Sequence, residues 1–159
     1  MQNFLSNVEF RFEIERLPNL KYHVQRASIP GITSGSIEYP TPFKNFPVSG
    51  DKLDYDDFTL GVAVDENMLS YTETLDWIKG ITFPDTFTQH QNLVADKGIL
   101  SDATLIILNS NKNPNIKFTF KDLFPVSIGG MDLDTTSASV DPVTMNVTFK
   151  YRTFDISRY

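Results

Sequence analysis

FPVSGDKLDYDDFTLGVAVDENMLSYTETLDWIKG, the stretch from Phe46 to Gly80, contains the signals that decide the fold. A glycine turn and acidic residues come first, and an alternating strand, an acidic break and an amphipathic helix follow. The alternation over residues 58–64 is typical of a half-buried β-strand. Its outward side chains are small and predict that the helix packs closely on them, namely Thr59, Gly61 and Ala63. This stretch therefore predicts the one helix-on-sheet unit of a β-rich domain.

The predicted helix begins at the acidic break that follows the strand. Asp65 or Asn67 is suited to cap its first turn, where acidic side chains also favour the positive end of the helix dipole. Gly80 is expected to end the helix. Apolar residues at helical spacing form the expected buried stripe, which consists of Met68, Tyr71, Leu75 and Ile78. Trp77 lies off the centre of this stripe, so we expect it to face a neighbouring loop or chain.

Alternating patterns outside this stretch predict further strands. The predicted strands span residues 8–15, 22–27, 58–64, 103–109, 116–121 and 143–151, with at most a short strand at 131–134. We expect the first two to pair as a hairpin, and 103–109 to pair with 116–121. Residues 81–101 show no period and are expected to be a loop with at most a short extra element. Roughly six to eight strands and one helix predict a mainly β fold, an antiparallel β-sandwich or partly open barrel with one α-helix packed on it.

Residues 29–57 are rich in proline and glycine, yet they also carry many apolar side chains. Proline cannot donate to a β-ladder, and long apolar loops in compact domains tend to be functional. We predict an assembly arm at about residues 29–57, while a meandering loop or short edge strands packed on their own core remains the alternative. The expected contact residues are Ile29, Ile32, Ile37, Tyr39, Phe43, Phe46, Val48 and Asp51.

Length, charge and composition bound the class of protein. The 159 residues suit a single domain over residues 1–159, and the absence of cysteine excludes disulfides and Cys-ligated zinc. A net charge of −6 argues against binding nucleic acid through its phosphates, although it suits a surface that DNA slides past. No apolar run is long enough to cross a bilayer, and the first residues lack a signal-peptide pattern. We expect no membrane anchor and no signal peptide.

Residues suited to catalysis or metal binding are few. His23 lies in a predicted strand and His90 in a predicted polar loop, and neither has a second His or Cys nearby to complete a metal site. Asp56 and Asp57 could serve acid–base chemistry, but residues of the turn before a strand are the simpler interpretation. The spacing of a calcium loop and the common nucleotide and nucleophile motifs are missing from the sequence. We expect no enzymatic activity, no metal and no cofactor.

Motifs from end to end of the chain follow a recognisable order. They are IPGI at 29–32, the proline-rich arm, SGDKLDYDDFTLGVAVDEN at 49–67, a helix with a Trp, FKDLFPVSIGGMDLD at 120–134 and VTMNVTFKYRTFDI at 143–156. The most specific residues are Gly50-Asp51, Asp57-Phe58 and Asp65-Glu66, with the terminal Phe149, Tyr151 and Phe154. This order resembles the tail tube proteins of T4-like contractile-tailed bacteriophages.

The resemblance implies a structural virion protein, assembled in the host cytoplasm, whose hexameric rings stack into the inner tube of a contractile tail. Sheets of neighbouring subunits would join into one ring barrel, with the helix outside and the arm reaching an adjacent subunit or ring. The implied partners are further copies of the chain, the sheath protein, the tape-measure protein, the baseplate tube initiator, the tail terminator and genomic DNA in transit. The lumen-facing acidic candidates lie on the outer face of the first strand and are Glu9, Glu13 and Glu15.

Two other classes of function stay open at this point. A baseplate tube initiator, a tail-tip protein or the tube of a contractile injection system would share the fold. A monomeric carbohydrate-binding β-sandwich would also suit the aromatic content, with exposed aromatic side chains on one concave face. Size-exclusion chromatography with negative-stain imaging separates the classes, because only the first group forms rings or tubes.

Overall fold

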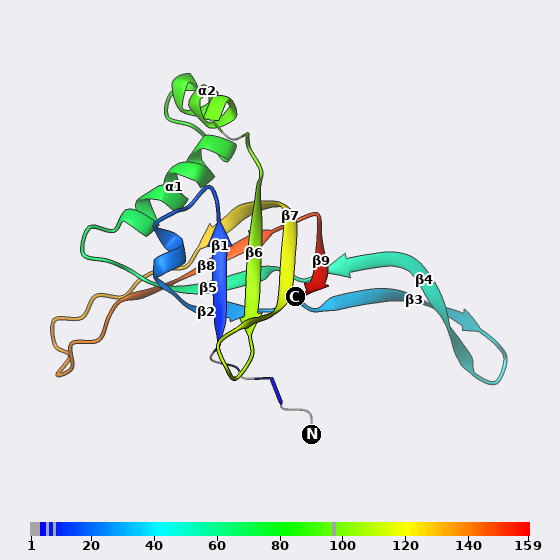
Figure 1. Ribbon diagram of the computed structural model, residues 1–159. Helices are drawn as coiled ribbons and strands as arrows, with labels where there is room; N and C mark the ends of the chain where they lie inside the picture. Colours follow the sequence, from blue (N-terminus) through cyan, green and yellow to red (C-terminus); the bar gives the residue numbers. More distant parts are fainter. Residues whose placement is uncertain (1–3, 6, 8, 97) are drawn as a thin grey trace.

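The computed structural model describes residues 4–5, 7, 9–96 and 98–159. They form a β-sandwich that carries helices at one end and a long hairpin that projects from its side (Figure 1). The elements in chain order are β1 (Phe10–Ile14), the 3-10 helix η1 (Leu20–Tyr22), β2 (Val24–Ser28), β3 (Ile32–Pro40), β4 (Asn45–Tyr55), β5 (Phe58–Ala63), α1 (Leu69–Thr82), α2 (Phe87–Asp96), β6 (Ser101–Leu108), β7 (Pro114–Ile128), β8 (Thr144–Lys150) and β9 (Thr153–Arg158). The predicted mainly β, antiparallel fold is confirmed, but the described part has nine strands and two α-helices, more of each than predicted.

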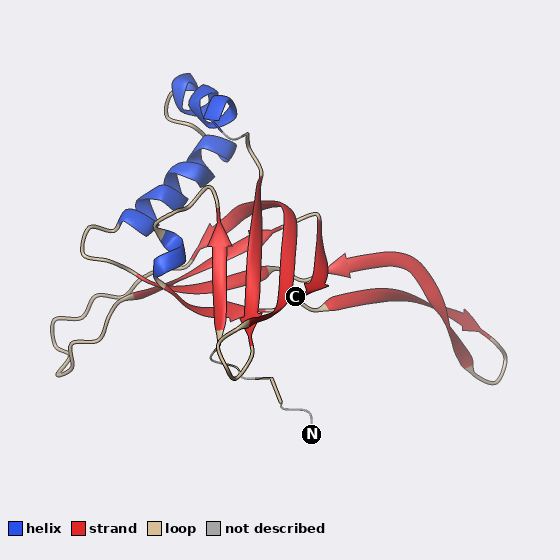
Figure 2. Cartoon of the chain, viewed as in Figure 1, coloured by secondary structure: helices blue, strands red, loops and turns tan. Residues whose placement is uncertain are grey.

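Two layers make up the sandwich, and every strand pairing in them is antiparallel. The first layer has the order β1-β6-β7-β9, and the second has the order β7-β8-β5-β2. The layers face each other through apolar rings, since the Phe12 ring of β1 lies 5.7 Å from the Phe58 ring of β5. Figure 2 shows the strands of the two layers beside the helical end.

Strand β7 belongs to both layers. Its first part pairs with β6 and β9, and residues 124–128 pair with β8. The direction changes beside Asp122, whose φ is 54°, and the Asp102 side chain accepts a hydrogen bond from the Asp122 backbone N–H at 3.1 Å. The prediction that the strand stops at 121 was wrong. Pro125 has no backbone N–H to donate to the neighbouring strand. It is tolerated because the pairing with β8 shifts register between Pro125 and Ser127, where the regular hydrogen-bond ladder is interrupted.

Alternation places the core as predicted. Phe58, Leu60 and Val62 of β5 are fully buried, and the opposite residues of β8 complete the same face. The helix lies on this apolar side, since the Trp77 ring is 6.4 Å from the Phe149 ring, which pairs with Phe58 across the ladder. The expectation that the helix covers the small residues of β5 was therefore wrong.

The expected hairpin between residues 8–15 and 22–27 does not form. Strand β1 pairs with β6, and β2 pairs with β5 in the other layer. Leu17 and Leu20 are buried in the connection, where η1 carries the chain from one layer to the other. Val8 lies outside the described residues. The 131–134 segment lies in a loop that contains no strand, as far as the structure describes the chain.

Helix α1 begins as predicted but buries a different face. The Asp65 carboxylate accepts a hydrogen bond from the Leu69 N–H at 3.0 Å, whereas the residue at the N-cap is Met68, with a φ of 52°, and not Asn67. The buried residues are Ser70, Thr74, Trp77 and Gly80, so the predicted stripe is not the centre of the buried face, although its member Tyr71 packs partly buried against the core. Trp77 is only 2% exposed, although its indole N–H does reach a loop, at the Ile99 carbonyl 3.0 Å away.

Helix α2 occupies the segment that was expected to be a loop. The helix α1 continues past Gly80 to Thr82, so Gly80 does not end it. Instead, Gly80 leaves room for α2, because a Cβ at this position would lie 3.4 Å from Leu93. His90 belongs to α2, and its Nδ1 lies 2.9 Å from the Gly80 carbonyl oxygen.

Candidate assembly surface

Strands β3 and β4 form a two-stranded sheet of their own. They pair with each other and with no other described strand. The resulting hairpin stands out from the sandwich at the right of Figure 1, so most of its surface faces solvent. The proline- and glycine-rich segment is therefore a β-hairpin, with one bulge, rather than a loop. We call residues 32–55 the arm.

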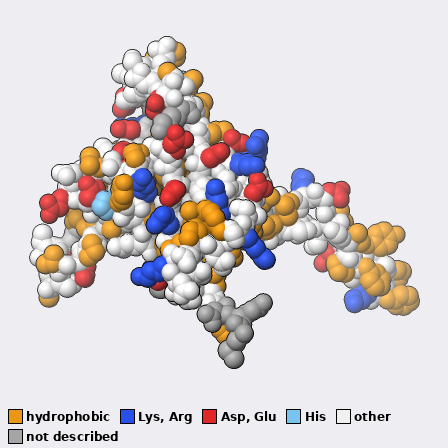
Figure 3. Space-filling model, viewed as in Figure 1, with side chains coloured by type: hydrophobic (Ala, Val, Ile, Leu, Met, Phe, Trp, Pro, Cys, Tyr) orange, Lys and Arg blue, Asp and Glu red, His pale blue; other side chains and the backbone are white. Residues whose placement is uncertain are grey.

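One face of the distal arm is apolar. Ile37 pairs with Val48 and Tyr39 pairs with Phe46, and residues two apart on a strand point to the same side. These four side chains are 51–65% exposed. Figure 3 shows hydrophobic side chains gathered on the arm. A contiguous apolar face that nothing covers is typical of a surface that binds another protein.

The opposite face of the distal arm is polar, and its tip carries an exposed aromatic side chain. Glu38 accepts a hydrogen bond from the Asn45 side chain at 3.1 Å on the polar face. Phe43 lies in the turn and is 99% exposed. The Lys44 Nζ lies 5.8 Å from the Phe46 ring centroid. The distal arm is thus amphipathic, with a free aromatic side chain at its end.

The other predicted contact residues lie elsewhere. Ile32 pairs with Tyr55 at the root of the arm and is 52% exposed. Asp51 lies in an irregular part of β4, exposed to solvent. Ile29 precedes the arm and lines a cavity of about 280 Å³ with β1 and β6, beside Leu105 and Ile107. Leu53 is a further exposed apolar residue of the arm, 54% exposed, which was not among the predicted contacts because it lies between the charged residues Lys52 and Asp54 in the sequence.

The irregularity in the arm depends on two glycines. Between the pairs Ser34–Leu53 and Ser36–Ser49, three residues of β4 lie opposite Gly35 alone. A Cβ on Gly50 would lie 2.6 Å from the Gly35 carbonyl oxygen, closer than atoms can approach. The bulge bends and twists the arm, so these glycines set the direction of its distal half.

The acidic lumen candidates lie on or next to β1. Glu13 is exposed and pairs with Thr104 on the outer face of the first layer. Glu9 is half-buried just before the strand, and Glu15 is exposed just after it. The same outer face also carries Arg11, so its charge is mixed.

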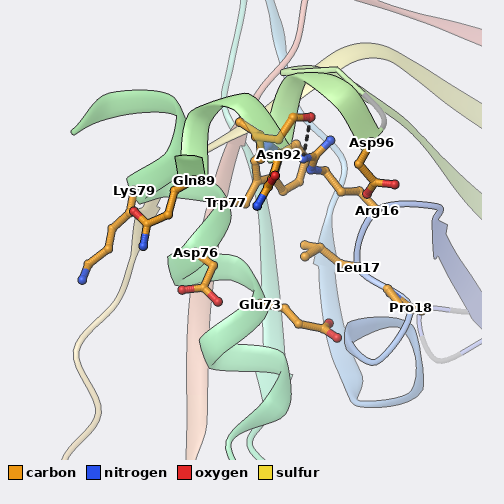
Figure 4. A pocket seen from close by; sticks show the side chains of 11 residues that line it. Arg16, Leu17, Pro18, Glu73, Asp76, Trp77, Lys79, Gln89, Asn92 and Asp96 are labelled. Atoms are coloured by element: carbon orange, nitrogen blue, oxygen red, sulfur yellow. Dashed lines mark hydrogen bonds between the residues drawn. The ribbon is translucent and has the colours of Figure 1, made fainter. Parts of the chain in front are cut away.

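A pocket of about 700 Å³, lined by both polar and apolar side chains, lies between α1, α2 and the segment after β1 (Figure 4). Arg16 holds one end of it, because its guanidinium donates to the Gly98 carbonyl at 2.5 Å and to the Leu93 carbonyl at 3.5 Å. The Arg16 guanidinium also lies 5.2 Å from the Trp77 ring centroid. Burial lowers the pKa of Arg16, and the nearby negative charge of Asp96 opposes this effect. Glu73 accepts from the Asn19 side chain at 2.5 Å. The side chains around the pocket therefore connect the segment after β1 with helices α1 and α2.

The residues considered for catalysis do not converge. The His23 carbonyl accepts the Ala63 N–H, and Asp57 lies 3.7 Å from the Lys150 Nζ. Within the described ranges, no group of three or more His, Cys, Asp or Glu side chains is arranged to hold a metal ion. The helices in those ranges are also too short or too polar to span a bilayer.

Comparisons with known proteins give a family and a fold. The profile of the phage tail tube protein family matches residues 2–157. A chain in the structure of the anti-feeding prophage tube-terminating cap is 17% identical, with a TM-score of 0.72 over 100% of this chain and 94% of that chain. A chain in the sheath/tube terminator of the extracellular contractile injection system PVC is 19% identical, with a TM-score of 0.70 over 98% of both chains. Hcp1 from Flavobacterium johnsoniae is 10% identical, with a TM-score of 0.50 over 98% of both chains. No curated protein matches the chain in sequence.

Proposed function

The chain belongs to the phage tail tube protein family, and from this premise we propose that it is the subunit of the inner tube of a contractile tail. In this proposal, six copies form a ring, and rings stack into a hollow tube through which DNA is ejected. The protein is a structural component of the virion, assembled in the host cytoplasm, and has no catalytic role. The apolar face of the arm is the observation that carries the proposal, because it needs a partner that the single chain does not supply.

The strand order of the sandwich supports joining of sheets between copies. Strands β1 and β9 are the two edges of the first layer, and three antiparallel pairings separate them. They therefore run in opposite directions. The same holds for β2 and the end of β7 in the second layer. A neighbouring copy placed at either edge would continue the antiparallel sheet, which is how open edges find partners.

The arm is proposed to contact a neighbouring subunit in the ring or in the next ring. Its four-residue apolar face would lie against that neighbour, and the exposed Phe43 would reach further. Asp51 and the residues around the bulge would adjust the direction of approach. The other proposed partners are the sheath protein on the helical side, the tape-measure protein and DNA in the lumen, and the tube initiator and terminator at the two ends.

The test of this function is the state of the purified chain in solution. Light scattering after size exclusion is expected to give a hexamer or larger species, and negative-stain images are expected to show six-fold rings or tubes. Tyr39→Ser, on the apolar face, should abolish them, because it removes a central aromatic contact. Glu38→Ser is the matched control, since it changes the opposite face of the same strand. A wild-type chain that stays monomeric at high concentration, or a Tyr39→Ser variant that forms normal tubes, contradicts the proposal.

The acidic residues beside β1 are proposed to face the lumen and to keep DNA from adhering. Reversal to Lys at Glu9, Glu13 and Glu15 is then expected to give tubes that retain DNA at low salt and release it as salt rises. Thr148→Lys, on β8 in the other layer, serves as the comparison. Equal DNA retention by the reversed and unmodified tubes would remove this part of the proposal.

A tube initiator or the tube of a contractile injection system is the second candidate. The fold is compatible with it, since a chain in the anti-feeding prophage baseplate shares this fold, with a TM-score of 0.70 at 16% identity. The length of the polymer separates an initiator from the other two, because an initiator stops at one ring whereas the subunit of either kind of tube polymerises further. Glycan-array binding by a monomer would instead favour the carbohydrate-binding alternative.

A further inference from the structure

The arm meets the body of the protein at a small group of aromatic side chains. We call Tyr55, Tyr151 and Phe154 the root cluster. Tyr55 is the last residue of β4, whereas Tyr151 and Phe154 lie at the turn between β8 and β9. The Tyr55 ring centroid is 5.7 Å from that of Tyr151 and 5.6 Å from that of Phe154, and both pairs are edge-to-face. This is the favoured geometry for aromatic pairs.

Hydrogen bonds join the same elements. The Tyr151 hydroxyl donates to the Asp56 carbonyl oxygen at 3.0 Å, and the Tyr55 hydroxyl lies 3.4 Å from the Thr153 Oγ1. The Asp56 N–H donates to the Gly31 carbonyl at 3.0 Å, which ties the two legs of the arm together. Both legs are therefore fastened at the level of the β8–β9 turn.

The root cluster is continuous with the core. The ring of Phe120, which is fully buried, lies 5.1 Å from Tyr151 and 5.8 Å from Phe154. Phe120 in turn stacks on Phe58 at 4.5 Å. An unbroken series of ring contacts thus runs from the root of the arm to the centre of the sandwich.

The described residues connect the arm to the body at few other places. Within them, β3 and β4 pair only with each other and join β2 and β5 through residues 29–31 and 56–57, where Asp57 lies 3.7 Å from the Lys150 Nζ. Two short connections of this kind would fix the position of a hairpin more closely than its direction. The root cluster lies where a further constraint on the direction would act.

We propose that Tyr55, Tyr151 and Phe154 are positioning residues that fix the direction in which the arm leaves the body. The apolar face of the arm is then presented in one orientation before any partner binds. Binding by a preoriented segment avoids the loss of conformational freedom that a swinging segment would suffer on docking. The value of this orientation for tube assembly rests on the proposed function, but the orientation itself is a property of the single subunit.

The experiment measures the direction of the arm in the isolated subunit. The chain has no cysteine, so Lys44→Cys at the tip and Asn111→Cys in the β6–β7 turn provide two unique sites for spin labels. Pulsed electron paramagnetic resonance on the monomeric fraction is expected to give one narrow distance distribution. In Tyr55→Ala and Tyr151→Ala that distribution should broaden and its mean should shift. Tyr39→Ala is the matched control, because it removes a tyrosine of the arm that lies away from the root, and it should leave the distribution narrow.

Two further readouts keep the result decisive. Thermal unfolding of each labelled variant checks that the sandwich is intact. Tyr151→Phe removes only the hydrogen bond to Asp56 and replaces any alanine variant that fails to fold. It should broaden the distance distribution less than the alanine variants do. A distribution that stays narrow in folded Tyr55→Ala and Tyr151→Phe overturns the proposal. The measurement uses single subunits and does not depend on ring formation. If the chain forms no rings but the variants show the expected broadening, the proposed function is contradicted and the positioning role of the root cluster is still supported.

Discussion

At the scale of single residues, Gly50 is predicted to be essential for the shape of the arm. In Gly50→Ala the new Cβ would collide with the Gly35 backbone, and overpacking of this kind typically costs about 1–3 kcal/mol. The arm can avoid the collision only by changing its path, so assembly should fail while the melting temperature of the sandwich changes little. Gly130→Ala is the control, since a Cβ there meets nothing within 4 Å. Normal tubes from Gly50→Ala would refute the prediction.

The buried residues of the strands were predictable from alternation. Phe58, Leu60 and Val62 are buried as predicted, because every second side chain of a strand faces the same way. The buried face of helix α1 was less predictable. It contains Ser70, Thr74 and Gly80, small residues whose role is close packing, and hydrophobicity does not identify such residues.

Tyr151 is predicted to make stability fall at high pH. Burial, and after it the charges of Tyr55, Asp56 and Asp57, raises its pKa from the ordinary 10.0 to about 12. The folded state then keeps the phenol proton that the unfolded state has lost, so the contribution of Tyr151 is complete below about pH 10 and is lost between about pH 10 and about pH 12.

Urea unfolding across this range measures that contribution. The free energy of unfolding of the wild type should decline more steeply with pH than that of Tyr151→Phe, which has no proton to lose. Parallel curves for the two proteins would show that the phenol of Tyr151 titrates in the folded state as it does in the unfolded chain.

At the scale of elements, the sequence predicted strands better than their partners. Strand β1 pairs with β6, far away in sequence, and no local pattern indicates such a pairing. Residues 81–101 were predicted as a loop with at most a short extra element, because helix α2 carries only three large apolar residues, Phe87, Leu93 and Val94, too few to show a helical period clearly. Strands β3 and β4 lie within the segment 29–57 that was predicted as an assembly arm. The sequence alone does not show that its apolar residues share one face, because this depends on the register that pairs Ile37 with Val48 and Tyr39 with Phe46.

Arg16 is predicted to hold α2 in place. Arg16→Met keeps the length of the side chain but removes the hydrogen bonds to the Leu93 and Gly98 carbonyls. Since the guanidinium is partly exposed, we expect the local free energy of opening to fall by about 1–2 kcal/mol. Hydrogen exchange of the amides of residues 87–96 should accelerate by roughly tenfold.

Lys79→Met provides the matched control for Arg16. It removes an exposed ion pair with Asp85 on the neighbouring surface, and such pairs contribute about 0–1 kcal/mol. Equal exchange of the α2 amides in the two variants would mean that contacts such as that of His90 with the Gly80 carbonyl hold the helix without Arg16.

At the scale of the whole molecule, the apolar arm predicts that stability depends on protein concentration. Association that requires the folded state adds about 2.7 kcal/mol at 100 times the dissociation constant. For a chain of this size that corresponds to a rise in melting temperature of roughly 5–10 °C. Calorimetry over a dilution series of the wild type should show this rise.

The same dilution series with Tyr39→Ser tests the cause of the effect. This variant keeps the sandwich but loses part of the apolar face, so its melting temperature should not vary with concentration. A parallel rise in both proteins would assign the association to another surface, such as the open edges at β1 and β9.

Strand β7 has a mechanical consequence for such a molecule. In many sandwiches only side-chain packing connects the two layers, so they can slide under shear. Here one covalent backbone is hydrogen-bonded in both layers, with its change of direction at Asp122. A load applied along one layer is transmitted to the other through the chain itself, and sliding would require the β7 ladders to break. The subunit should therefore resist shear as one stiff block, so that deformation under force is confined to the contacts between subunits.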